Sequence, residues 1–236
     1  MPTTLITGAN RGIGLELARQ YLAEGWRVHA ACRNPNEARE LKDLSGDLSV
    51  HEMDVTLQHE IDAVSDRIGG EAIDLLVNNA GIADNYGTGV LEGKDDPDPA
   101  NYDYDVWAEV LKVNVLGQGR VTGAFADNVA ASDRKIIAMM ASGLSSIENT
   151  WMGGRYAYRT SKAALNMMMR GVGAWLEPRG VIVVSIAPGW TKTDLGGPNA
   201  MNTVEEACEG MRAVLGKLTI ADTGTYWNFD GEQLPF

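Results

Sequence analysis

The sequence contains few cysteines, no long apolar run and no excess of basic residues, and each scarcity excludes a class of protein. Its two cysteines, Cys32 and Cys208, stand far apart and form neither a metal-binding nor a redox motif. We therefore expect reduced thiols, a cytoplasmic location and no bound metal. No stretch approaches the roughly 20 apolar residues of a membrane helix, and the first residues lack the basic region of a signal peptide. We expect no membrane association.

The balance of charge is strongly acidic. The formal net charge is −12 at neutral pH, whereas nonspecific binding to nucleic acid relies on Lys and Arg side chains that neutralise phosphates. We therefore expect no nucleic-acid partner. A polyanionic cofactor would need local positive charge on such a protein.

Short β-branched runs alternate with longer helical patterns along all 236 residues, which is typical of βαβ units and a parallel sheet. The length and the hydrophobic fraction of 44% suit a single α/β domain, residues 1–236, with a doubly wound parallel sheet of about seven strands between two helical layers. The segment Asp84–Asp105 is expected to be a surface loop. The expected strands lie near Thr3–Thr7, Arg27–Cys32, Leu48–Met53, Ile73–Asn78, Lys135–Ala141, Val181–Ile186 and Tyr226–Phe229. The expected helices lie near Gly12–Glu24, Glu37–Leu44, His59–Ile68, Val106–Asn128, Tyr156–Leu176 and Val204–Leu215.

A glycine-rich turn stands between the first expected strand and the first expected helix. It reads Thr7-Gly8-Ala9-Asn10-Arg11-Gly12-Ile13-Gly14. Glycine allows positive φ angles and a close approach of the backbone to a ligand. The helix that follows offers unpaired N–H groups and the positive end of its dipole, which suit a pyrophosphate. The position after an apolar strand makes this a strong indication of a dinucleotide site.

The pattern Thr-Gly-x-x-x-Gly-x-Gly resembles the cofactor motif of the short-chain dehydrogenase/reductase family. The resemblance recurs in order along the chain, in Asn78-Asn79-Ala80-Gly81, Asn114, Tyr158-Arg159-Thr160-Ser161-Lys162 and Pro188-Gly189. It implies a Rossmann-type fold and hydride transfer with a nicotinamide dinucleotide. The Tyr-Arg-Thr-Ser-Lys stretch and the ending Asp230–Phe236 resemble C-factor-like and sniffer-like carbonyl reductases more narrowly.

The end of the second strand favours NADP(H) over NAD. Sites for NAD usually place an acid there to bind the ribose 2′-hydroxyl, but this strand ends in Cys32-Arg33-Asn34. A guanidinium can bind a 2′-phosphate through two hydrogen bonds. Arg33 is the first candidate and Arg11 the second. The full set of expected cofactor contacts is Thr7, Gly8, Asn10, Arg11, Gly12, Ile13, Gly14, Arg33, Asp54, Val55, Asn78, Ala80, Tyr158, Lys162, Pro188, Gly189, Thr191 and Thr193.

Tyr158 and Lys162 stand four residues apart on an expected helix and therefore project from nearly the same face. A phenol has a pKa of about 10, and a nearby ammonium together with oxidised nicotinamide would lower it. The resemblance implies that Tyr158 is the acid/base group. It also implies that Lys162 adjusts the pKa of Tyr158 and binds the nicotinamide ribose.

Four further residues complete the expected site. The resemblance suggests that Ser142 polarises the substrate carbonyl, although Ala141 and Met139 depart from the family pattern, and Ser145 remains the alternative. The resemblance implies that Asn114 holds a water that links Lys162 to solvent. It also implies that the Thr191 backbone and the Thr193 hydroxyl bind the nicotinamide carboxamide.

The favoured function is reduction of an aldehyde or ketone by NADPH, in a reversible reaction. The short segment 194–200 suggests an open pocket that accepts varied carbonyl compounds, with Trp151, Met152 and Trp190 as candidate walls. By resemblance the helices near 106–128 and 156–176 form the interface of a homodimer or homotetramer. Two alternatives stay open. One is a nucleotide-binding signalling or regulatory protein of the same fold, and the other is an NAD-linked dehydrogenase working in the oxidative direction.

Overall fold

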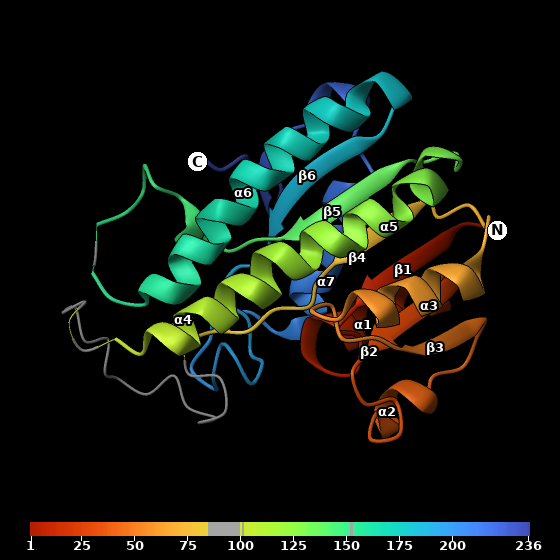
Figure 1. Cartoon of the computed structure of the whole chain (residues 1–236), viewed down its shortest axis with the longest axis horizontal. Coiled ribbons are helices and arrows are strands. Elements are labelled where there is room, and N and C mark those ends of the chain that lie inside the picture. Colours follow the sequence, from red (N-terminus) through yellow and green to blue (C-terminus); the bar gives the residue numbers. More distant parts are fainter. Residues whose placement is uncertain (85–99, 101, 152) are drawn as a thin grey trace.

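A seven-stranded parallel sheet forms the centre of the computed structural model, which describes residues 1–84, 100, 102–151 and 153–236 (Figure 1). The strands are β1 Thr3–Thr7, β2 Arg27–Cys32, β3 Leu48–Glu52, β4 Leu75–Asn78, β5 Ile136–Met140, β6 Ile182–Ala187 and β7 Tyr226–Asn228. Their order is β3-β2-β1-β4-β5-β6-β7. The order reverses between β1 and β4, and ligands of open α/β sheets collect at the carboxyl ends of strands on either side of such a reversal.

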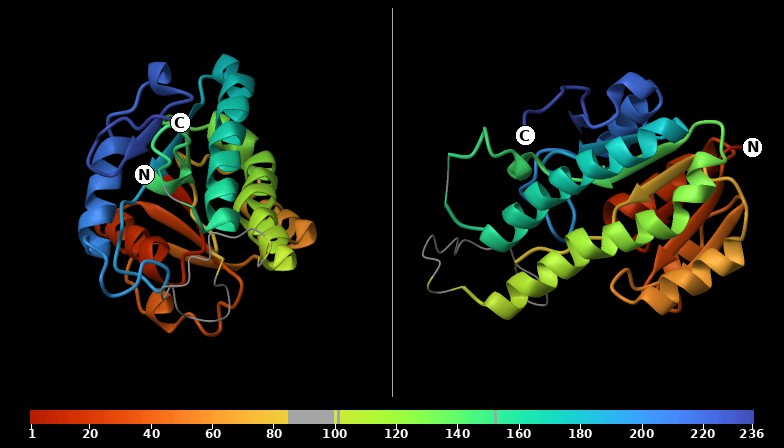
Figure 2. Two further views of the ribbon diagram at one scale, coloured as in Figure 1. Left: turned by 90° about the vertical axis from the view of Figure 1, so that its left-hand side faces the viewer. Right: turned by 45° about the horizontal axis from the view of Figure 1, so that its top comes forward.

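Helices cover both faces of the sheet, as the left view of Figure 2 shows. One core lies beneath α1 (Gly12–Ala23), α2 (Arg39–Lys42) and α7 (Val204–Leu215). The other lies beneath α3 (Gln58–Ile68), α5 (Gln118–Ala130) and α6 (Tyr156–Leu176). Strands such as β5 and β6 are buried throughout, because a parallel sheet is covered on both faces. The predicted three-layer, doubly wound fold is confirmed. No helix among the described residues combines the length and apolarity required to cross a bilayer.

The long helix expected over Val106–Asn128 differs from a regular α-helix in the middle. It consists of α4 (Tyr104–Leu111), a π-helical segment η2 (Lys112–Gly117) and α5. At Gly117 a Cβ atom would lie 2.7 Å from the Val55 side chain, so only glycine allows this approach to the sheet. Single π-helical turns within α-helices often mark functional sites.

Two other expectations need adjustment. The helix expected over Glu37–Leu44 is reduced to α2, because Glu37 and Ala38 donate backbone hydrogen bonds to Asn34 and Pro35 in a turn. The loop expected over Asp84–Asp105 falls largely on residues 85–99 and 101, which lie outside the described residues.

Candidate active site

The glycine turn joins β1 to α1 at the carboxyl edge of the sheet. Gly8 and Gly12 have φ angles of 65° and 53°, which side-chain-bearing residues rarely adopt. A Cβ atom on Gly14 would lie 2.4 Å from the carbonyl oxygen of Gly8, so α1 packs directly on the turn. Arg11, at the N-cap position, makes no side-chain hydrogen bond to the first turn of α1. Those N–H groups therefore suit an anionic ligand.

Asn79 ties this turn to the end of β4. Its Nδ2 donates to the carbonyl oxygens of Thr7 and Gly8 over 2.9 and 3.1 Å. The Thr7 hydroxyl oxygen accepts from the backbone N–H groups of Asn79 and Ala80, both over 3.0 Å. Asn78, the residue chosen from the sequence, is fully buried, and its Nδ2 donates to Thr122 Oγ1 over 2.9 Å. Sequence reasoning missed this role of Asn79, which the alternation of side chains at the end of a strand could have indicated.

The segment that follows β6 lies against the glycine turn. The Thr193 side chain is 3.4 Å from the place where a Cβ of Gly12 would stand. Asp194 and Arg11 form an ion pair of 2.8 Å, although both side chains are largely exposed. The Thr191 hydroxyl donates to the Pro188 carbonyl oxygen over 2.8 Å, so it stabilises the turn after the strand.

The other expected cofactor residues also lie at this edge. Arg33 directly follows the last residue of β2 and is exposed. Asp54 and Val55 follow β3, where the Asp54 carboxylate accepts the Thr56 N–H over 2.8 Å. Backbone donors at a helix N-terminus, glycines that leave space and two guanidinium groups together fit a phosphorylated dinucleotide. Individual contacts with that group stay predictions.

Tyr158 and Lys162 project from α6 into the interior at the carboxyl ends of β4 and β5. Their exposed fractions are 9% and 3%. Lys162 Nζ lies 5.8 Å from the Tyr158 ring centroid and donates to the Met140 carbonyl oxygen over 2.7 Å. Ser142 lies beside Tyr158, close enough for its side chain to lower the pKa of the phenol. The structure therefore brings Ser142, Tyr158 and Lys162 together.

Ser142, rather than Ser145, stands beside Tyr158. Ser145 is buried, donates from its hydroxyl to the Ser142 carbonyl oxygen over 2.7 Å and accepts from Asn166 Nδ2 over 2.9 Å. The Tyr226 hydroxyl, from β7, also donates to the Ser142 carbonyl oxygen. Ser145 and Tyr226 thus hold the backbone that presents Ser142.

Asn114 lies in the π-helical segment η2 and is fully buried. Its Oδ1 accepts the Ile82 N–H, and its Nδ2 donates to the Ile82 carbonyl oxygen, both over 2.8 Å. The same Nδ2 donates to Ser161 Oγ over 2.9 Å. Asn114 Oδ1 and Lys162 Nζ lie 3.3 Å from the place where a Cβ of Gly81 would stand, so they flank this glycine. The water relay stays a prediction, but the amide clearly anchors the chain after β4.

Burial controls the protonation of the central pair. It raises the pKa of Tyr158, and the Ser142 side chain and the charge of Arg155 offset this only in part. Burial also lowers the pKa of Lys162 to about 8. In the protein alone, the loss of hydration of the phenolate outweighs the nearby positive charge. The expected lowering of the Tyr158 pKa, which includes the charge of oxidised nicotinamide, stays a prediction.

The expected substrate walls are only partly in place. Trp151 is 87% exposed, and Trp190 donates from Nε1 to the Gly196 carbonyl oxygen over 2.8 Å. Met152 lies outside the described residues. A hollow of about 180 Å³ lies next to Ser142 and is lined by Gly143, Leu144, Ser146, Asn149, Thr150, Trp151 and Arg159.

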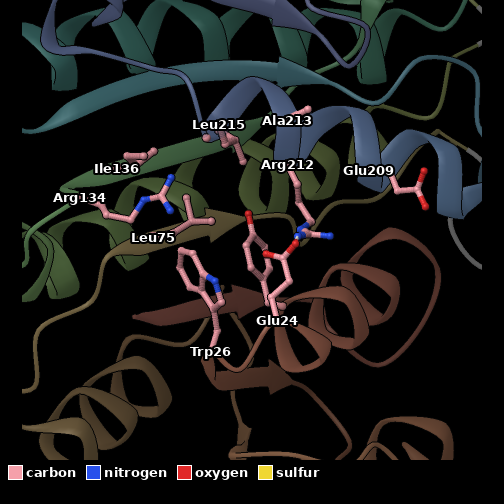
Figure 3. Close-up of a pocket in the computed structure, with 11 residues that line it drawn as sticks. Glu24, Trp26, Leu75, Arg134, Ile136, Glu209, Arg212, Ala213 and Leu215 are labelled. Atoms are coloured by element: carbon pink, nitrogen blue, oxygen red, sulfur yellow. The ribbon is translucent and has the colours of Figure 1, made fainter. Parts of the chain in front are cut away.

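A larger hollow of about 350 Å³ lies at the other edge of the sheet (Figure 3). Leu75 and Ile136 begin β4 and β5, and Trp26 precedes β2, so this hollow is at the amino ends of the strands. It therefore does not belong to the candidate active site.

A glycine turn at the reversal of strand order, beside a buried Tyr–Lys pair and a serine, defines a class of dinucleotide-dependent oxidoreductases. Residues 2–203 match the family model of the short chain dehydrogenases. The chain belongs to the short-chain dehydrogenase family, as the resemblance predicts.

Similar proteins include carbonyl reductases of known structure. The NADPH-bound carbonyl reductase from chicken fatty liver has a TM-score of 0.87 and 30% identity, with 100% of this chain and 99% of that chain covered. The carbonyl reductase Sniffer of D. melanogaster has a TM-score of 0.89 and 29% identity, with both chains fully covered. C-signal of Myxococcus xanthus is 34% identical over 164 residues, which are 70% of this chain and 93% of that protein.

Proposed function

We propose that this protein reduces an aldehyde or ketone to the alcohol with NADPH, in a reversible reaction within one catalytic domain, residues 1–236. The observation that carries this proposal is the grouping of Ser142, Tyr158 and Lys162 at the sheet edge that holds the glycine turn. The similarity to an NADPH-bound carbonyl reductase supports the same cofactor here.

The cofactor would lie across the carboxyl ends of the strands. Bound NADPH supplies the hydride that reaches the carbonyl carbon. The first turn of α1 would hold the pyrophosphate through its N–H groups, and Arg33 and Arg11 would bind the 2′-phosphate. Arg11 would then exchange Asp194 for the phosphate, at small cost because the exposed ion pair is weak.

Tyr158 donates the proton to the carbonyl oxygen. Its raised pKa favours the protonated phenol, which is the form that reduction requires at neutral pH. The Ser142 hydroxyl donates a second hydrogen bond to that oxygen as negative charge develops there. Lys162, held by the Met140 carbonyl oxygen, provides positive charge beneath the tyrosine ring.

Other features of the structure bear on the substrate class, the oligomeric state and the location of the protein. The short segment after Thr193 and the hollow beside Ser142 support a site that accepts varied carbonyl compounds. Exposed Leu116, Met167 and Trp175 on η2 and α6 support a homodimer or homotetramer through these helices, which light scattering would measure. Both cysteines are free and buried, which supports the proposed cytoplasmic location.

A signalling role is the second candidate, because C-signal is among the similar proteins. Binding alone needs no proton-donating phenol, so the intact Ser142, Tyr158 and Lys162 favour the reductase.

Nicotinamide absorbance tests the proposal directly. Wild type is assayed with a panel of aldehydes and ketones, with NADPH or NADH, next to Tyr158→Phe. Tyr156→Phe is the matched control, since it removes a hydroxyl from the same helix two residues earlier. We expect turnover with NADPH by wild type and by Tyr156→Phe, but a loss of at least about 100-fold in Tyr158→Phe. Turnover that survives in Tyr158→Phe would refute the role of the tyrosine.

A further inference from the structure

The catalytic helix α6 begins without a capping side chain of its own. The residue at its N-cap position, Arg155, has φ 51° and ψ 37° and makes no side-chain hydrogen bond to the first turn. The N–H groups of a first helical turn have no partner within the helix. Tyr158 is the third residue of α6, so whatever binds this turn also positions the catalytic phenol.

The partners of these N–H groups come from the chain after β4. Asp84 Oδ1 accepts the Tyr158 N–H over 2.6 Å. The Tyr102 hydroxyl accepts the Tyr156 N–H over 2.8 Å and donates to Asp84 Oδ2 over 3.0 Å. One carboxylate therefore binds the helix both directly and through Tyr102. A negative charge at this end is also favoured by the helix dipole.

The same short stretch of chain connects to the other side of the site. Ile82, two residues before Asp84, is held through its N–H and carbonyl oxygen by Asn114. Residues 82–84 therefore join the π-helical segment to the first turn of α6. Because both connections use hydrogen bonds shorter than 3 Å, a shift of this stretch would move Tyr158 relative to Asn114.

We propose that Asp84 is a positioning residue of the active site, whose carboxylate holds the first turn of α6 and sets the electrostatic environment of Tyr158. This inference rests on the proposed reductase function. Asp84 touches the backbone of the catalytic residue and not the reacting atoms.

Removal of the Asp84 charge changes the pKa of Tyr158 in a predictable direction. The negative charge of Asp84 raises the pKa of Tyr158, against the effect of Arg155. An uncharged side chain at position 84 therefore lowers this pKa. The groups around the phenol are Ser142 after β5, Arg155 at the N-cap position of α6, Lys162 in α6, Tyr226 in β7 and Asp84 itself.

The pH profile of kcat for carbonyl reduction provides the test. Reduction requires the protonated phenol, so kcat falls as pH rises through the apparent pKa of Tyr158. In Asp84→Asn the amide oxygen can still accept the N–H, whereas the charge is gone, so we expect this fall at lower pH than in wild type. Asp84→Ala loses the cap as well, and we expect kcat to decrease about 10- to 100-fold with little change in the KM for NADPH.

Asp103→Asn is the matched control. Asp103 caps α4 by accepting the N–H groups of Asp105 and Val106 over 3.0 and 3.1 Å, so the variant changes the same charge at a helix that does not carry Tyr158. We expect its pH profile to match wild type. An Asp84→Asn profile that superimposes on wild type, or an equal displacement in Asp103→Asn, would overturn the inference.

A second readout needs no activity. In ¹⁵N-labelled protein the hydrogen bond to the Asp84 carboxylate should move the Tyr158 amide proton downfield and slow its exchange with solvent, and Asp84→Ala should abolish both effects. A Tyr158 amide with the same chemical shift and exchange rate in wild type and Asp84→Ala overturns the inference whatever the activity. The expected amide signal in a wild-type protein that reduces no carbonyl compound refutes the proposed function instead, and leaves the contact between Asp84 and Tyr158 standing.

Discussion

Lowering the pH from 7.5 to 5 should destabilise the fold, because His51 takes up a proton in the unfolded chain but stays largely neutral in its buried site. His51 on β3 is 3% exposed and lies beside His29 on β2, with 3.0 Å between its Nε2 and the His29 Nδ1. The Arg67 guanidinium lies 3.5 Å from His51 Nδ1. A guanidinium only donates, so Nδ1 is the acceptor and the hydrogen of the neutral ring sits on Nε2. A second proton on Nδ1 would face Arg67 directly.

The size of the effect follows from the pKa of His51. Burial, with His29 and Arg67 nearby, lowers it from 6.5 to about 4. The unfolded chain therefore takes up this proton before the folded protein does, and stability falls as the pH drops below about 6.5. The loss from this one group is about 2 kcal/mol at pH 5 and approaches about 3 kcal/mol below pH 4.

Urea unfolding at pH 7.5 and pH 5.0, at constant ionic strength, measures this loss. His51→Gln should lose about 2 kcal/mol less than wild type between the two pH values, whatever its stability at pH 7.5. His59→Gln, at an exposed position on α3, should keep the wild-type difference. If His51→Gln and wild type lose equal stability between the two pH values, the reasoning about the buried imidazole is wrong.

Three further predictions concern the candidate site. Gly14→Ala should abolish NADPH binding, measured by fluorescence titration, because the new methyl group would stand 2.4 Å from the Gly8 carbonyl oxygen; binding at wild-type affinity would contradict the described packing. Arg33→Asp should weaken NADPH at least about 10-fold while NADH changes little, since a carboxylate repels the 2′-phosphate; an unchanged ratio of the two KM values would exclude Arg33 as the phosphate ligand. Ser142→Ala should lower kcat about 100-fold, whereas Ser145→Ala should mainly lower the melting temperature; the reverse pattern would exchange their roles.

The fold and much of the site could be predicted because they depend on local patterns. The alternation of apolar runs and helical periodicity indicated the parallel sheet, and α6 and α7 have the predicted bounds. The spacing of Tyr158 and Lys162 placed them on one helical face, and the structure brings them together near Ser142.

The other features of the candidate site depend on contacts between segments that are far apart in the sequence. The spacing of residues within a motif does not reveal such contacts. The π-helical segment coincides with the hydrogen bonds of Asn114 to Ile82, 32 residues away. The raised pKa of Tyr158 depends on the depth of burial. Asp84 has no motif of its own, because its role arises only when the stretch after β4 folds against the first turn of α6.

Hydrogen bonds to main-chain carbonyl oxygens hold several parts of the proposed catalytic site in place. Lys162 binds the carbonyl oxygen of Met140, and Tyr226 binds that of Ser142. Every amino acid carries a carbonyl oxygen, so such attachments tolerate replacement of the side chains around them. This explains how Met139 in β5 and Ala141 after it can depart from the family's usual residues while the chain still presents Ser142 to Tyr158. Substitutions along this strand can therefore change the packing of the two cores while the proposed proton-transfer groups keep their places.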